Sequence, residues 1–505
     1  MKKILFFVLF IIYLVLNVSI LKDFYLDFGD VALISLKVEF AKQFNEYLGP
    51  YSRMGFFHPG PVIFYLYAFL EPFLKFLVFF PVNSVSFYYY IAQFLINFLF
   101  LVLIFDAFPK SVSHNIRWIF LLIYLILLEN LNNTSFSLLF DVWGPVIIIF
   151  PLLLLMISLT TLFVESHRYE LFFYLSLSLS MILSNHLSGM IYAGLFSFFG
   201  LIWFFYKNRI AINKKSVLWI SFSILWLTLS FLPIIYEFFI NYPDNNIFKI
   251  IEVSRKTSSL RKGNEVIKYF GDLWSIFILG KAYSFLGWMI FLSINLFLYN
   301  RLKKTKNLFI KYLYRFSLIQ TILLFFYIVK IPHDLLHYLS WFYYSIASLY
   351  ILMVIILLFE ENIFEENNKN IYIIILLIFL LFFRLGYKAW NLNKGFYQKS
   401  LVLIEIKKQF VFDPNVEHKI EWGFMDEHHN NWVVASGIVL NLYKNHIPVC
   451  VDKNWLFMFG KEFDCKNHLK TLFIKKIHNN FQMPEVKIED NLKVLYYFDY
   501  QIYLK

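Results

Sequence analysis

A short segment near the N-terminus gathers the residue types that group transfer needs. Asp27 and Asp30 stand close together, and Arg53 and His58 follow among Gly and Pro residues that favour defined turns. A carboxylate can take a proton from an attacking hydroxyl, and an arginine can give two hydrogen bonds to a phosphate. Together these roles describe group transfer from a lipid phosphate. An acidic pair next to an apolar stretch can also simply mark a membrane boundary, and both interpretations stay open.

Polar residues recur where other apolar stretches end. The candidates are Asp141, Trp143, His186, Glu237, Asn246, Arg255, Lys268, His333 and His337. Taken singly, the histidines are more often helix-end or packing residues, and Asp141 suits a structural role as well as a functional one. The basic loop that contains Arg255 and Lys268 is typical of a solvated surface, but it could also hold anionic headgroups or a pyrophosphate.

The composition places these residues in a membrane protein. Of 505 residues, 59% are hydrophobic, 22% aromatic and only 16% charged, and the mean hydropathy is +0.61. Soluble domains average about 45–50% apolar and about 25% charged residues, so a cytoplasmic globular enzyme is excluded. Disorder is excluded too, because it needs low hydrophobicity and high charge. The net charge of +12 is therefore interpreted as membrane topology and not as a nucleic-acid partner.

Eleven apolar stretches are long enough, with their flanks, to be transmembrane helices. They lie at about 4–21, 87–105, 117–130, 144–164, 171–184, 190–206, 216–236, 273–300, 312–330, 338–359 and 371–390. Lys2 and Lys3 and the basic loops 207–215 and 301–315 predict a cytoplasmic N-terminus. This topology leaves no crossing for the apolar segment Pro59–Phe80, whose interior Glu71 and Lys75 suit a juxtamembrane helix on the outer surface. An odd number of spans also delivers the C-terminus to the outside.

A second domain begins near residue 391, where charged residues become denser. We expect a transmembrane domain over 1–390, with a first external loop over 22–86, and a small α/β domain over 391–505. Asn431–Tyr443 is predicted as an amphipathic helix, and the predicted β-rich runs are 447–451, 470–477 and 493–504. Cys450 and Cys465 could form one disulfide or remain two free thiols.

Several short motifs resemble one family of membrane enzymes. The motifs are Asp30-Val-Ala-Leu-Ile, Gly49-Pro-Tyr51-Ser-Arg53, His58-Pro-Gly-Pro61, Trp143-Gly-Pro145, Pro233 to Glu237 with Asn246-Ile, and Pro448-Val-Cys-Val with Trp455 to Gly460. Together with many spans and an external C-terminal domain, they resemble the GT-C superfamily of integral-membrane glycosyltransferases. Within it, the motifs resemble uncharacterised bacterial members more closely, and protein O-mannosyltransferases and the lipid A aminoarabinose transferase more distantly.

The resemblance implies transfer of a sugar from a polyprenyl-phosphate carrier to a glycan, lipid or protein acceptor of the cell envelope. The reaction would take place at the periplasmic face of the bacterial inner membrane. Asp30 would activate the acceptor; because Val31 replaces a second acidic residue found in some relatives, Asp27 could compensate, and His58 would shape the site. The donor phosphate would involve Arg53, Tyr51, Asp141, Trp143, Arg255 and Lys268. Acceptor-binding or site-shaping roles would belong to His186, Glu237, Asn246, His333 and His337. Some members need a divalent metal, although no compact set of metal ligands is visible in the sequence.

Two other functions stay open. A transporter or flippase of a lipid-linked glycan would usually place ionisable residues at the bilayer midplane, where these spans carry almost none. A non-catalytic partner in envelope-glycan assembly is the third hypothesis. The tail either binds acceptor glycan through aromatic residues such as Trp422, Trp432 and Trp455, or forms a lid that packs over the external loops.

Overall fold

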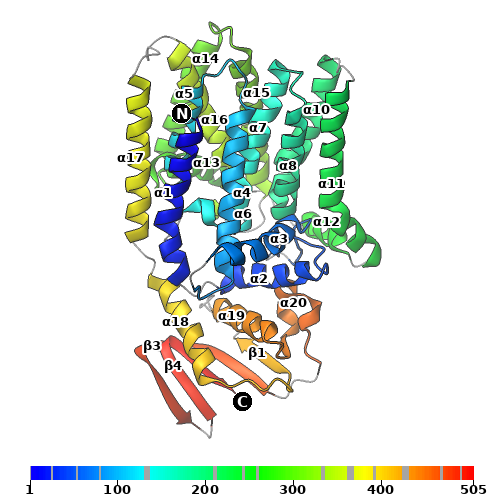
Figure 1. Ribbon diagram of the computed structural model, residues 1–505, viewed down its shortest axis with the longest axis vertical. Coiled ribbons are helices and arrows are strands. Elements are labelled where there is room, and N and C mark those ends of the chain that lie inside the picture. The colour runs from blue at the N-terminus through cyan, green and yellow to red at the C-terminus, as the bar shows by residue number, and fades with distance from the viewer. Residues whose placement is uncertain are drawn as a thin grey trace.

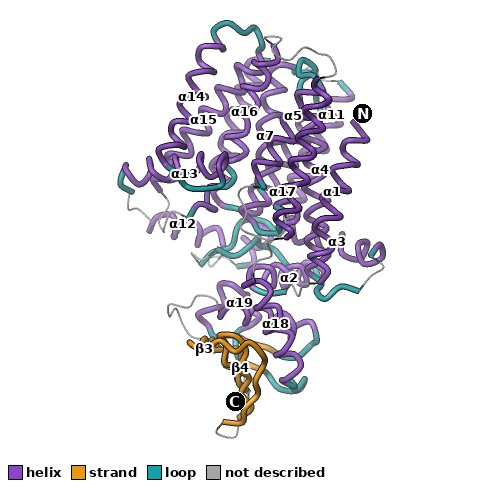
Figure 2. The backbone as a smooth tube through the Cα atoms, turned by 90° about the vertical axis from the view of Figure 1, so that its left-hand side faces the viewer, coloured by secondary structure: helices purple, strands orange, loops and turns teal. Residues whose placement is uncertain are grey.

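The computed structural model is a helical bundle with a small mixed domain at one end (Figure 1). It describes residues 2–23, 27–52, 55–78, 81–129, 137–208, 213–241, 245–256, 261–330, 336–360, 369–390, 394–422, 431–466, 470–489 and 492–504. The strands gather at the end of the molecule farthest from the long helices (Figure 2). A mostly helical fold with a small C-terminal sheet is therefore confirmed.

The bundle consists of apolar helices. They are α1 (Lys2–Asp23), α4 (Ser86–Ala107), α5 (His114–Leu128), α6 (Gly144–Ile147), α7 (Ile149–Val164), α8 (Glu170–Asn185), α10 (Phe196–Lys207), α11 (Lys214–Ile240), α14 (Ser284–Leu302), α15 (Leu308–Lys330), α16 (Tyr343–Glu360) and α17 (Lys369–Trp390). Within the described residues, five helical segments are long and apolar enough to cross a membrane, and five shorter apolar helices accompany them. The apolar core of α6 and α7 is completely buried, whereas α11 is only 17% buried, as expected of a helix that faces lipid. The count of eleven spans stays a prediction.

The predicted span 273–300 is wrong, because two helices occupy it. Helix α13 (Gly263–Leu279) ends at Gly280, which has a left-handed backbone (φ +72°), and α14 begins at Ser284. The two helices cross at Gly271 and Gly287, where a Cβ on Gly287 would collide with the Gly271 carbonyl. The apolar composition continues across the break, so only the glycine marks it.

Two helices, α2 (Gly29–Lys42) and α3 (Val62–Leu77), lie across the lower end of the bundle in Figure 1. Helix α3 confirms the helix predicted within 59–80; Phe69 and Phe76 on it are exposed, while buried Glu71 pairs with Lys42 and Lys75. The sequence analysis missed α2. This helix is buried on nearly every side, so it lacks the single apolar stripe by which a surface helix is predicted.

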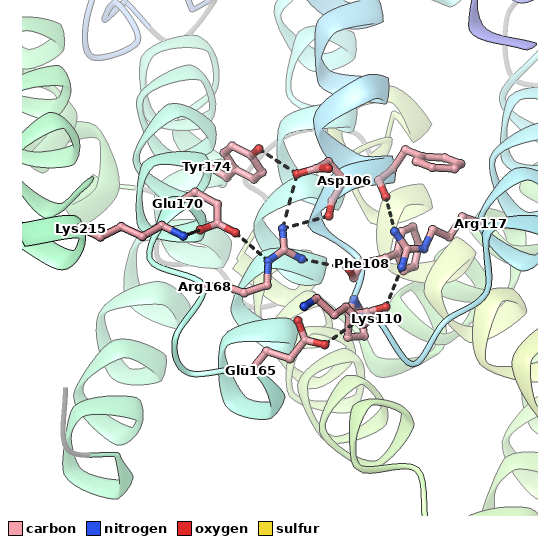
Figure 3. A network of polar contacts seen from close by, with 11 residues as sticks. Asp106, Phe108, Lys110, Arg117, Glu165, Arg168, Glu170, Tyr174 and Lys215 are labelled. Atoms are coloured by element: carbon pink, nitrogen blue, oxygen red, sulfur yellow. Dashed lines mark hydrogen bonds and ion pairs between the residues drawn. The ribbon is translucent and has the colours of Figure 1, made fainter. Parts of the chain in front are cut away.

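The opposite end of the bundle is held by two arginines (Figure 3). Arg117 of α5 is buried, and its guanidinium donates hydrogen bonds to the backbone carbonyls of Phe105, Pro109 and Val112. These bonds give partners to carbonyl groups at the end of α4 and in the turn that follows it. Arg168, between α7 and α8, pairs with the carboxylate of Asp106 at the end of α4. These contacts fix the connections that lie farthest from the tail domain.

The tail domain is a four-stranded sheet with helices packed against it. In chain order it contains α18 (Lys394–Gln409), β1 (His418–Trp422), α19 (Asn431–Lys444), β2 (Val449–Val451), α20 (Leu456–Phe459), β3 (Lys470–Glu489) and β4 (Leu492–Leu504). The strand order is β2-β1-β3-β4; β1 is parallel to β2 and β3, and β4 is antiparallel to β3. The predicted helix and three strands are confirmed, and β1 was missed. Cys450 and Cys465 form a disulfide. Of the two alternatives, one disulfide or two free thiols, the first is therefore confirmed.

Candidate active site

Asp30 lies at the second position of α2, at the end of the bundle where the tail domain packs. Gly29 precedes it with φ +58°, a conformation that glycine adopts without strain. The hydroxyl of Tyr51 donates a 2.6 Å hydrogen bond to Oδ1 of Asp30, and both side chains are half-buried. The N-terminal end of a helix is favourable for a negative charge. A fixed, partly accessible carboxylate of this kind can accept a proton from a bound hydroxyl.

One tyrosine is near enough to three of the predicted carboxylates to interact with them electrostatically. Tyr90, in the first turns of α4, lies within electrostatic range of Asp27, Asp30 and Asp141. Asp141 comes from the connection between α5 and α6, and its Oδ1 accepts the backbone N–H of Trp143 at 2.9 Å. The structure therefore brings together acidic residues that are more than 100 positions apart in the chain. The sequence analysis missed Tyr90, whose only signal was a run of three tyrosines at the start of an apolar stretch.

Asp27 has a different environment from Asp30, because it is 5% exposed. Its Oδ1 accepts hydrogen bonds from both the backbone N–H and the hydroxyl of Ser86, at the start of α4. Lys407 of α18 lies within electrostatic range of the carboxylate. A Cβ on Gly437 of α19 would lie 2.5 Å from the Asp27 carbonyl. Asp27 thus joins the α1–α2 connection to α4 and to the tail domain, an arrangement that suits anchoring better than chemistry.

The motif between Gly49 and His58 folds into a small hairpin that presents Tyr51 to Asp30. Gly49 donates to the His58 carbonyl at 2.7 Å, and His58 donates back to the Pro50 carbonyl at 2.8 Å. Tyr51 and Phe57 face each other as an antiparallel bridge. Arg53, the predicted phosphate ligand, lies outside the described residues. The turns expected from Gly and Pro therefore position at least the tyrosine of the site.

His58 and His186 form a buried stacked pair, with ring centroids 5.0 Å apart. Nδ1 of His58 accepts the backbone N–H of Leu187 at 3.0 Å, so the ring is a neutral acceptor at that nitrogen. Burial, together with the neighbouring His186, lowers the pKa of His58 well below its usual value, and burial lowers the pKa of His186 to about 4. Both rings are neutral at pH 7. The pair joins the hairpin to the end of α8 and is suited to shaping the site.

Glu237 and Asn246 connect α11 and α12 to the hairpin. Oε1 of Glu237, buried in α11, accepts the backbone N–H of Asn246 at 3.1 Å. The Asn246 side chain opens α12 (Asn246–Lys256) and pairs with the backbone of Phe57, donating to its carbonyl at 2.7 Å and accepting its N–H at 2.8 Å. Phe57 directly precedes His58 in the hairpin. Glu237 and Asn246 therefore support the hairpin through contacts with the backbone.

The remaining predicted residues have other surroundings. His337 stacks on Tyr269 of α13 with centroids 5.4 Å apart, and it lies within electrostatic range of Asp272. Trp143 packs edge to face on Trp341 at 5.7 Å, next to the short helix His337–Ser340. Arg255 on α12 and Lys268 on α13 are exposed. His333 lies outside the described residues.

The tail domain covers the first loop directly. The Ser436 hydroxyl of α19 donates to the Gly29 carbonyl at 3.3 Å, and a Cβ on Gly29 would lie 3.3 Å from Val433. Phe457 of α20 packs edge to face on Tyr51 with centroids 6.3 Å apart. This arrangement agrees with the lid interpretation of the tail. Over the described residues, no three His, Cys, Asp or Glu side chains are grouped as metal ligands.

No protein-family model matches the chain, and no curated protein matches it. Two solved structures, both of ArnT from Cupriavidus metallidurans, match its fold. The apo structure matches with a TM-score of 0.58 and 10% identity over 100% of this chain and 97% of that one. The structure bound to undecaprenyl phosphate matches with a TM-score of 0.54 and 11% identity over 100% and 98%. The chain therefore shares the ArnT fold along its whole length, which agrees with the architecture expected from the sequence.

Proposed function

We propose that the protein is a membrane glycosyltransferase that moves a sugar from a polyprenyl-phosphate-linked donor to a glycan, lipid or protein acceptor of the bacterial envelope. The observation that carries this proposal is the Asp30 carboxylate, held by Tyr51 at the N-terminus of α2. The fold supports it, because one of the ArnT structures that share this architecture contains undecaprenyl phosphate.

In the proposed reaction, Asp30 accepts the proton of an acceptor hydroxyl while that oxygen forms a bond to the anomeric carbon of the donor sugar. The bond between this carbon and the phosphate oxygen breaks, and its electron pair leaves with the polyprenyl phosphate. Asp30 then releases its proton to solvent. Cations would stabilise the phosphate as charge develops on it; Arg53, by its place in the hairpin sequence, and the exposed Arg255 and Lys268 are the candidates.

The reaction would occur outside the cytoplasm, on the face that carries the tail domain. The disulfide between Cys450 and Cys465 supports this orientation, because disulfides persist in oxidising compartments such as the bacterial periplasm. The basic segments at Lys2 and Lys3 and after α10 and α14 support a cytoplasmic placement of the other end. The protein is accordingly assigned to the inner membrane, with its C-terminal domain in the periplasm.

The proposal is tested with the full-length protein in lipid nanodiscs and a panel of synthetic polyprenyl-phosphate sugars. Products on envelope glycolipid and glycan fractions are detected by mass spectrometry. Wild-type protein should add one sugar increment, and Asp30→Asn should lower the rate by about 10²–10⁴-fold. Glu39→Gln is the matched control, because Glu39 is another carboxylate of α2 that forms ion pairs with Lys42 and Lys444.

If Asp30→Asn transfers sugar as fast as the wild-type protein at equal protein level, Asp30 is not the base and the proposal is refuted. A transporter would instead move lipid-linked glycan across a proteoliposome membrane without changing its mass. Transport without a new product would therefore favour that alternative.

A further inference from the structure

A row of aromatic side chains leads from the surface of the tail domain to Asp30. Trp455 stacks on Phe457 with ring centroids 6.2 Å apart, and Phe457 packs on Tyr51 at 6.3 Å. Tyr51 then donates its hydrogen bond to Asp30. Each of the three aromatic residues is half-buried, so each keeps part of its surface exposed. The row therefore connects an accessible surface to the proposed base.

The segment that carries Trp455 and Phe457 is held firmly in place. The disulfide between Cys450 and Cys465 closes the loop that contains both residues. Beneath the row, Trp455 packs at 4.8 Å on Trp422, which is 5% exposed. Aromatic side chains fixed in this way lose little conformational entropy when a ligand binds them.

Polar side chains lie on the same disulfide-closed loop as Trp455 and Phe457. Asn454 directly precedes Trp455, Lys461 and Glu462 follow Phe457 in the sequence, and all three are exposed. A sugar ring has an apolar face of C–H groups and an edge of hydroxyls, so it fits aromatic faces accompanied by mixed donors and acceptors. An acyl chain would need a continuous apolar groove, and a nucleic acid would need a stripe of positive charge. The mixed polar composition of this loop therefore favours a carbohydrate.

We propose that Trp455, Phe457 and Tyr51 form an acceptor subsite that binds a sugar ring and presents one of its hydroxyls to Asp30. This inference rests on the proposed function and deepens it, because it makes the acceptor a carbohydrate or the glycan part of a glycolipid. The tail domain then supplies part of the acceptor site in addition to covering the first loop.

The test measures transfer kinetics of Trp455→Leu and Phe457→Leu in nanodiscs, with an envelope oligosaccharide fraction released by mild acid as the acceptor. The KM for the acceptor should rise about tenfold, the change expected for the loss of one aromatic contact. The kcat should fall by much less than the KM for the acceptor rises, and the KM for the donor should stay at its wild-type value. Trp455→Phe should recover most of the acceptor affinity. Tyr503→Leu is the control, because Tyr503 is a half-buried aromatic residue that stacks on Phe473 of the sheet.

A second measurement does not depend on how the variants fold. Saturation-transfer NMR on wild-type protein should show magnetisation passing from aromatic protons to the same oligosaccharides. Unchanged acceptor KM in both leucine variants, or no transfer to any oligosaccharide, would overturn the subsite. Oligosaccharide binding in a protein that uses no polyprenyl-phosphate donor would instead overturn the proposed function and leave the subsite standing.

Discussion

The hydroxyl of Tyr51 lies 2.6 Å from Oδ1 of Asp30, although the two residues come from different elements of the first loop. This contact joins the hairpin to the N-terminus of α2. It gives the two residues different expected roles, because the carboxylate would take the proton and the phenol would orient the carboxylate.

Tyr51→Phe should lower transfer less than Asp30→Asn does. Loss of one hydrogen bond to a charged group costs about 1.5–3 kcal/mol, which corresponds to a rate loss of about 10–100-fold. Loss of the base should cost about 10²–10⁴-fold. Initial rates for the two variants under identical conditions check this order. Equal losses, or a larger loss in Tyr51→Phe, would contradict a Tyr51 hydroxyl that only orients the carboxylate.

Asp27→Ala should weaken the fold and loosen the tail domain. The change removes the buried carboxylate that accepts hydrogen bonds from the Ser86 N–H and hydroxyl, which keep their contacts with Ser84 and Ser35, and it removes a charge near Lys407. Loss of a hydrogen bond to a charged group costs about 1.5–3 kcal/mol. Thermal unfolding and limited proteolysis of the tail measure both effects. Glu421→Ala is the control, because Glu421 is partly exposed and its partner Lys419 keeps a second carboxylate, Asp452. Equal behaviour of the two variants would refute the anchoring role.

Gly60→Ala should destabilise the protein more than Gly55→Ala does. Both glycines have a left-handed backbone, at φ +90° and +82°, so both alanines are strained. Only at position 60 would the new Cβ meet a neighbour, the Ser184 hydroxyl at 2.7 Å, whereas nothing lies within 4 Å at position 55. The extra cost should be about 1–3 kcal/mol. The difference between the two melting temperatures measures the packing of the hairpin on α8, and no difference would contradict that packing.

Local patterns in the sequence were enough to predict a large part of this arrangement. Apolar length predicted most bundle helices, and the conflict between charge and topology at 59–80 predicted the surface helix α3. Alternation and amphipathic period predicted α19 and three strands of the tail sheet. The Gly and Pro residues around His58 predicted a structured loop. Each of these signals lies within one short segment.

The features that the sequence did not predict depend on contacts between distant segments. Asp27 and Asp30 look equivalent in the sequence, but Ser86 and Gly437 lie against the first and Tyr51 donates a hydrogen bond to the second. Helix α2 has no single apolar stripe because the bundle and the tail domain bury it from both sides. The approach of Phe457 to Tyr51 likewise requires the whole fold.

Acidification should destabilise the hairpin through the histidine pair. The pKa of His186 is lowered to about 4 by burial, and that of His58 is also lowered, whereas an unfolded histidine titrates near ~6.5. Between about pH 6.5 and 4 the unfolded state therefore binds more protons than the folded state, so stability falls as the pH decreases. The slope for each histidine is about 1.4 kcal/mol per pH unit at most. Above pH 6.5 both states are neutral and this contribution is constant.

The melting temperature of wild-type protein in nanodiscs should accordingly drop between pH 6.5 and 4, and His186→Gln should show a shallower drop because one titrating group is gone. His446→Gln serves as the control, because this histidine lies at the end of α19 in the tail domain, away from the stacked pair. Identical pH profiles for wild type and His186→Gln would show that the stacked pair is not the group that acid protonates. A shallower profile for His186→Gln would show that the acid sensitivity arises at the contact between His58 and the end of α8. This contact belongs to the same hairpin that presents Tyr51 to Asp30.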